Sequence, residues 1–153
     1  IETVKKRAHG DDQAAASARA ALAQALDVML RLFAPFMPFV TEEVWSWWRE
    51  GSVHRQSWPT IDELPADGDP ELVADLASAL IGVRGAKSDA KVSMKTPILS
   101  VTIAGPAESL ERLRSIEQDL RAVGSITGDI TWLEGDEVSV NDVVLGEPPA
   151  KRK

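Results

Sequence analysis

The sequence has no cysteine, only two histidines and no long apolar run. Without cysteine there is no disulfide framework, no thiolate metal site and no cysteine nucleophile. The longest apolar stretch, residues 32–40, contains Pro35 and Pro38 and is much shorter than the ~20 residues that span a bilayer. His9 and His54 lie far apart, without a carboxylate pair at ligand spacing, so we expect no metal site. These absences favour a cytoplasmic protein that does not enter the membrane.

The overall composition is typical of a folded protein. The chain has 153 residues, of which 44% are apolar and 27% are charged, enough for one domain or two small ones. It begins with Ile1 and not with methionine, and its first residues are typical of the interior of a helix, so we interpret the chain as a piece of a longer protein. A glycine-rich phosphate loop, a Ser/His/Asp pattern and a nucleophile elbow are all missing. We therefore expect no catalytic residue and no cofactor within this chain.

Charge is unevenly distributed along the sequence. The net charge is -7, and residues 59–83 contain only acidic charges. The sign then reverses, because residues 84–97 contain four cations against Asp89 alone; these are Arg84, Lys87, Lys91 and Lys95. The acidic total opposes nonspecific nucleic-acid binding by the whole surface, and we expect no DNA partner. A local basic patch can still act over a Debye length of ~8–10 Å.

The first half of the sequence is predicted to be helical. Asp11 and Asp12 precede a helix that ends or kinks at Pro35. Its apolar face is expected to consist of Ala18, Leu22, Ala25, Leu26, Met29 and Phe33. A second helix is expected from Pro38 to Glu50, with Gly51 as its stop. Residues 59–70 are rich in proline and acidic residues, which is typical of a surface linker.

The second half changes from helical to strand periodicity. A helix is expected from Glu71 onward to Lys91, followed by a strand over residues 99–103. A further helix over 110–123 and two strands over 130–133 and 138–145 follow, and a turn at 134–136 predicts that these two strands form a hairpin. The predicted fold class is α+β. A helical bundle occupies residues 1–95, a small β-α-β-β subdomain residues 96–147, and a flexible basic tail residues 148–153.

The strongest candidate site is the cluster of four cations. Arg84, Lys87 and Lys91 have the spacing i, i+3 and i+7, which predicts a shared helix face, and Lys95 extends the patch into the next loop. Cations so arranged suit a phosphate backbone. The alternative is that they only complement the carboxyl end of a helix.

Four of the five tryptophans form a second feature. Trp45 and Trp48 are expected on one helix face, Trp47 elsewhere and Trp58 in the following loop. Exposed tryptophans stack on unpaired bases. The alternative is that these side chains fill the bundle core and its junction with the second half.

Residues 30–45, LRLFAPFMPFVTEEVW, carry a family resemblance. The paired Pro-Phe steps, the Thr-Glu-Glu and the tryptophan resemble the anticodon-binding helical bundle of class I aminoacyl-tRNA synthetases of the valyl, isoleucyl and leucyl group. Residues 51–59 are similar to the serine-and-tryptophan loop that follows in valyl and isoleucyl enzymes. Residues 83–95 are similar to valyl-tRNA synthetases, especially those of actinobacterial type. Residues 91–96, KVSMKT, have the wrong order for the family's second catalytic motif, so they are assigned no catalysis.

The resemblance implies the C-terminal region of a valyl-tRNA synthetase, with a bundle incomplete at its amino end. It implies tRNA(Val) as partner, together with the catalytic and editing domains of a parent ligase that uses ATP and Mg²⁺ to attach valine. The chain itself would be non-catalytic. Arg84, Lys87, Lys91 and Lys95 are the expected contacts to the RNA backbone, with Arg31 and Arg49 as weaker candidates. Two alternatives stay open: an isoleucyl parent, and a structural or protein-interaction module that braces the parent enzyme.

Overall fold

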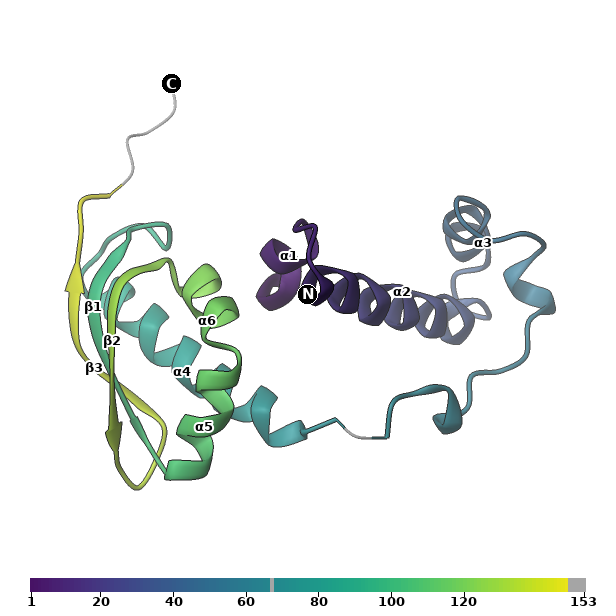
Figure 1. Cartoon of the computed structure of the whole chain (residues 1–153). Coiled ribbons are helices and arrows are strands. Elements are labelled where there is room, and N and C mark those ends of the chain that lie inside the picture. Colours follow the sequence, from purple (N-terminus) through teal and green to yellow (C-terminus); the bar gives the residue numbers. More distant parts are fainter. Residues whose placement is uncertain (67, 149–153) are drawn as a thin grey trace. The chain divides into compact units, whose positions relative to one another are not determined.

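The computed structural model describes residues 1–66 and 68–148, which form six α-helices, two short 3₁₀-helices and three strands (Figure 1). The elements are α1 (Glu2–Ala8), α2 (Gln13–Phe33), α3 (Pro38–Ser46), η1 (Val53–Arg55), η2 (Ile61–Glu63), α4 (Pro70–Asp89), β1 (Ile98–Gly105), α5 (Ala107–Ser115), α6 (Glu117–Gly124), β2 (Ile126–Glu134) and β3 (Ser139–Leu145). The predicted α+β class is confirmed. The expected basic tail lies outside the described residues except for Pro148. No helix of the described segments has the length and apolar character needed to cross a membrane.

The chain divides into two compact units, one formed by Ile1 and Arg7–Gly68, and one formed by Glu2–Lys6 together with the chain from Asp69 onward. In the first unit, α2 begins as predicted, because the Asp12 side chain accepts a hydrogen bond from the Ala15 amide at 2.7 Å. Helix α3 begins at Pro38 as expected but ends at Ser46, earlier than the predicted Glu50. The Ser46 hydroxyl donates to the Glu43 carbonyl at 2.7 Å, a local bond that competes with helix continuation.

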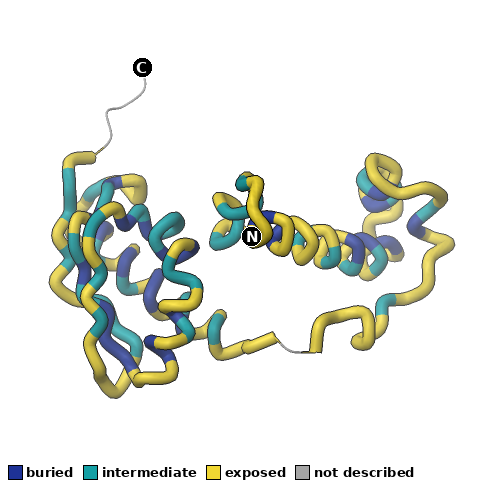
Figure 2. Tube along the Cα trace, viewed as in Figure 1, coloured by how far each residue is buried: buried dark blue, intermediate teal, exposed yellow. Residues whose placement is uncertain are grey.

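The core of the first unit is small. It consists of Leu30, Ala34, Trp45 and Val53. Much of the predicted apolar face of α2 is exposed, including Met29 and Phe33, each close to half accessible. With residues of α3 they line an apolar groove of about 280 Å³. Figure 2 accordingly shows long exposed stretches along α2 and α3.

The second unit contains a three-stranded sheet in the order β2-β1-β3. Strand β1 is parallel to β2 and antiparallel to β3, so the predicted hairpin between the last two strands is wrong. Residues 135–138 instead pass over the end of β1, where the Gly135 amide donates to the Gly105 carbonyl at 2.9 Å. The most buried strand thereby takes the centre of the sheet, and the two more exposed strands become its edges.

Helices α4, α5 and α6 cover one face of this sheet (Figure 1). The core joins residues of α4, such as Leu80 and Val83, to Ile98 and Ile103 of β1. Gly82 brings α4 close to β3, since a Cβ there would lie 2.7 Å from the Val140 Cβ. Residues 70–89 therefore pack with the sheet, whereas the sequence placed them in the bundle; periodicity predicts an apolar helix face but not the surface that it covers.

Strand β2 begins at Ile126, earlier than predicted, and a helix predicted as continuous is interrupted. The helix expected over 110–123 is divided into α5 and α6 by Ile116, whose backbone is not helical (φ -118°, ψ 23°). The Ser115 hydroxyl donates to the Arg112 carbonyl at 2.6 Å just before the break. Such a bond gives the backbone carbonyl an alternative partner and often bends a helix.

Candidate functional site

The candidate cations of the second unit do not share one helix face. Arg84, Lys91 and Lys95 are exposed, and within residues 1–66 and 68–148 none of the three forms an ion pair. Arg84 lies on α4, Lys91 in the turn after this helix, and Lys95 in the loop before β1. These three side chains remain available for an anionic ligand.

Lys87 is a correction to the predicted site, because its side chain is only 1% exposed. Its ammonium donates to the carbonyls of Met94 and Gly124, at 2.9 and 2.8 Å. Burial lowers the pKa of Lys87 from its ordinary value. A side chain so enclosed cannot reach an RNA backbone. Leu76, Leu80, Val83 and Lys87 follow a helical repeat, a signal that would have placed Lys87 on the core face.

The turn that carries Lys91 has a defined geometry. Lys91 was predicted to lie on the helix, but α4 ends at Asp89. The φ of Lys91 is 55°, in the left-handed region. The Val92 amide donates to the Lys87 carbonyl at 3.1 Å and the Lys91 amide to the Ser88 carbonyl at 2.9 Å. This is a Schellman motif, in which the left-handed position is usually glycine. A lysine stands there instead, with its charge in solvent.

Arg31, a weaker candidate, is engaged in an ion-pair network of the first unit. Its side chain is 9% exposed and contacts Asp27 at 2.8 Å and both carboxylate oxygens of Glu63. The hydrogen bond to Glu63 is the main cause that raises the pKa of Arg31. The same bond, with the Thr60 amide, lowers the pKa of Glu63. Arg31 therefore fastens the 57–63 segment to α2 and is not free to bind RNA.

Arg49 is more accessible than Arg31, with half of its side chain exposed. It donates to Asp27 at 2.9 Å and lies over the ring of Trp48, 4.7 Å from its centroid. Trp45 is buried beside them, 6.2 Å from Trp48 between ring centroids. Asp27 thus bridges both arginines, a role that sequence reasoning missed although its i, i+4 spacing to Arg31 is a known ion-pair signal.

These groups line a polar pocket of about 380 Å³. Its lining consists of Asp27, Arg31, Trp45, Arg49, Glu50, Gln56 and Glu63. Of the tryptophans, Trp45 fills the core as one alternative expected, whereas Trp47 and Trp58 are more than half exposed. These two side chains therefore lie outside the core of the first unit.

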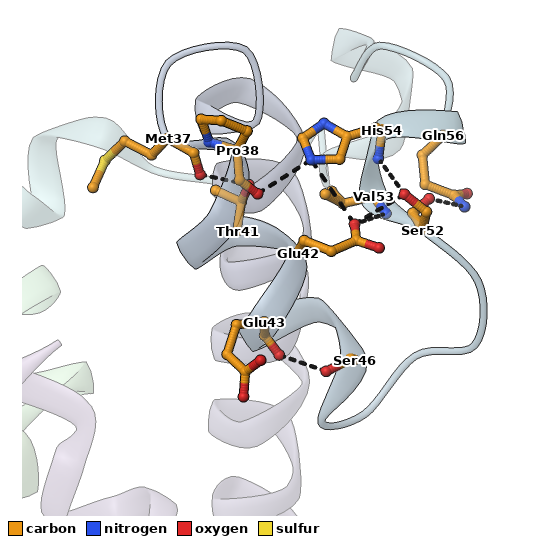
Figure 3. A network of polar contacts seen from close by, with 10 residues as sticks. All are labelled: Met37, Pro38, Thr41, Glu42, Glu43, Ser46, Ser52, Val53, His54 and Gln56. Atoms are coloured by element: carbon orange, nitrogen blue, oxygen red, sulfur yellow. Dashed lines mark hydrogen bonds and ion pairs between the residues drawn. The ribbon is translucent and has the colours of Figure 1, made fainter.

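The Thr-Glu-Glu motif stabilises the first unit (Figure 3). Glu42 accepts hydrogen bonds from the Ser52 hydroxyl at 2.9 Å and the Val53 amide at 3.0 Å, which caps η1. Glu43 turns elsewhere and accepts from the Trp47 indole at 3.1 Å. His54 closes the network, with its Nε2 3.1 Å from the Pro38 carbonyl. The motif therefore ties α3 to the following loop, and its two carboxylates point to different partners.

Comparison with known proteins adds independent findings. The family described as "Anticodon-binding domain of tRNA ligase" matches residues 1–103. Valine–tRNA ligase of Cutibacterium acnes is 55% identical over 157 residues, which cover 100% of this chain and 18% of that protein. Valine–tRNA ligase of Thermobifida fusca is 49% identical over 131 residues, covering 83% of this chain and 15% of the relative. That of Salinispora tropica is 43% identical over 165 residues, covering 95% and 19%.

Proposed function

Since the chain belongs to the anticodon-binding domain family of tRNA ligases, we propose that it holds the anticodon arm of tRNA(Val) within a longer valine–tRNA ligase. The observation that carries this proposal is the family match over residues 1–103, which include every exposed candidate cation. The chain spans less than a fifth of the length of these relatives. The ATP-dependent attachment of valine is proposed for the parent ligase, and this chain contributes RNA binding to it. The relatives named above favour a valyl over an isoleucyl parent.

The exposed cations of the second unit supply the backbone contacts. Arg84, Lys91 and Lys95 are unpaired among the described residues, so binding a phosphate would not require an existing ion pair to break. Each phosphate contact releases condensed counterions and makes affinity depend on salt. Such contacts position the RNA but do not read its sequence.

The first unit offers groups that suit unpaired bases. The Trp48 ring is partly exposed, and Trp47 and Trp58 are more so. A base stacked on an aromatic ring contributes about 1–3 kcal/mol, largely independent of sequence. Arg49 lies over Trp48 and keeps half of its side chain in solvent, which allows it to take part in such a stack.

The test is tRNA(Val) binding by the full-length ligase in which Arg84, Lys91 and Lys95 are changed to glutamate. We expect a loss of affinity and a salt slope smaller by about 2–3, since each of the three contacts contributes roughly 0.7–0.9. The matched control replaces the same residues by Lys, Arg and Arg, which preserves charge and should preserve the slope. Unchanged affinity and slope in the glutamate variant would contradict the backbone contacts.

A competition experiment separates RNA recognition from a bracing role. If the chain only supports the parent enzyme, substitutions at Trp48 and Arg49 should leave the preference for tRNA(Val) over a noncognate tRNA unaltered. If it reads the anticodon arm, loss of the Trp48 stack should weaken the binding of both tRNAs, because stacking is largely independent of sequence. Loss of Arg49, whose guanidinium donors can hydrogen-bond a base edge, should reduce that preference. The measurement is the ratio of the two dissociation constants at one fixed salt concentration.

A further inference from the structure

Lys87 is a buried cation to which the proposed function gives no role. It is 1% exposed and pairs with no carboxylate among residues 1–66 and 68–148. Its two hydrogen-bond acceptors are main-chain carbonyls from different parts of the second unit. Burying a charged group costs free energy unless hydrogen bonds compensate for the lost hydration. The two hydrogen bonds of this ammonium therefore indicate what its burial does for the fold.

The first acceptor is the carbonyl of Met94, in the loop between α4 and β1. That loop carries two of the three exposed candidate cations of the second unit, Lys91 and Lys95, one on each side of Met94. The main chain of Lys87 holds the same segment, because its carbonyl accepts from the Val92 amide at 3.1 Å. Lys87 therefore binds the loop at two points: its carbonyl accepts from the amide of residue 92, and its ammonium donates to the carbonyl of residue 94.

The second acceptor, the Gly124 carbonyl, connects Lys87 to a helix that packs on the sheet. Gly124 is the last residue of α6, and its carbonyl lies 2.8 Å from the Lys87 ammonium. The carboxyl end of a helix carries partial negative charge, which favours a cation there. The loop is thus tied through one ammonium to the ends of two helices that pack on the sheet.

We propose that Lys87 is a positioning residue that fixes the loop of residues 91–95, so that Lys91 and Lys95 are held ready for an RNA phosphate backbone. The proposal rests on the proposed function. A loop that is already ordered loses less conformational freedom on binding, and this difference appears as affinity. Lys87 acts through its neighbours and does not itself touch the RNA.

The test is a double-mutant cycle in the full-length ligase with tRNA(Val) transcript as the probe. Lys87→Met keeps the alkyl stem but removes the donor, and we expect it to weaken binding about threefold to tenfold. In a Lys91→Ala/Lys95→Ala background the same change should alter affinity less than twofold, because the cations that it positions are gone. Equal losses in both backgrounds, or no loss in either, would overturn the proposal.

Arg84→Met is the matched control, since Arg84 lies on the same helix and is exposed. It removes a cation directly, so its effect should be the same in both backgrounds. If Lys87→Met prevents folding, as judged by circular dichroism, Lys87→Gln replaces it in the cycle. Its amide keeps a polar group at the site, but the side chain is shorter and lacks the charge that strengthens both hydrogen bonds. The ligase with Lys87→Gln should then bind tRNA more weakly than the ligase with Lys87, but only when Lys91 and Lys95 are present.

The cycle also separates this proposal from the one on which it rests. If Lys91→Ala/Lys95→Ala alone binds tRNA(Val) with the affinity and salt slope of the unaltered ligase, the two lysines are not backbone contacts. That outcome overturns the assignment of the RNA surface. If the double variant is weakened but Lys87→Met is not, the surface stands and only the positioning role of Lys87 is overturned.

Discussion

Replacing Lys91 by glycine should raise stability and weaken RNA binding at the same time. Lys91 occupies the left-handed position of the Schellman motif that ends α4, with φ 55°. A residue with a Cβ is disfavoured there by roughly 1–2 kcal/mol, whereas glycine adopts this conformation freely. Glycine also gives the unfolded chain more freedom, which costs about 0.5–1 kcal/mol. The net expectation is a gain of about 0.5–1 kcal/mol in the free energy of unfolding.

The gain is measured by thermal unfolding of the 153-residue chain, followed by circular dichroism. If the second unit, which contains Lys91, unfolds as one cooperative unit, the gain corresponds to an increase of about 2–8 °C in its melting temperature. Binding of tRNA(Val) to the full-length ligase is measured in parallel over a series of salt concentrations. Removal of one backbone contact should reduce the salt slope by about 0.7–0.9.

Lys91→Ala is the control that separates the two effects. Alanine removes the charge but keeps the Cβ, so RNA binding should fall as far as in Lys91→Gly while stability stays near that of the original chain. A glycine variant less stable than the alanine variant would refute the argument from backbone strain. An alanine variant with unchanged affinity and slope would refute the argument from charge.

Two further predictions concern the second and the first unit. Gly128→Ala should destabilise the chain by more than about 3 kcal/mol, because the new Cβ would lie 1.7 Å from the Leu99 carbonyl oxygen; Gly135→Ala, with no neighbour closer than 3.5 Å, is the tolerated control in denaturant titration. An NMR titration should give Glu63 a pKa below its ordinary value, and Arg31→Met should abolish most of the difference. The stabilisation from this pair is present above pH 4.5 and is lost as the pH falls through the lowered pKa.

The helices of the first half and the residues that begin them were largely predictable. Asp12 and Pro38 act locally, through a side-chain cap and a missing amide, so their effect does not depend on distant residues. The alternation from Leu99 to Ile103 likewise predicted β1. The position of β3 was not predictable in this way. A short turn favours a hairpin, and only the arrangement of the whole sheet places β1 between the two final strands.

The candidate site shows the same division. The sequence by itself determined the family resemblance, the α+β class and the concentration of cations in residues 84–95, because these depend on residue identity and short spacing. Tertiary structure decided which cations face solvent: α4 packs on the sheet, and the boundary of its buried face falls between Arg84 and Lys87. It also decided that Arg31 is held by Glu63, a partner far along the chain. Spacing can place charges near one another, but burial and long-range pairing depend on which surfaces meet when the chain folds.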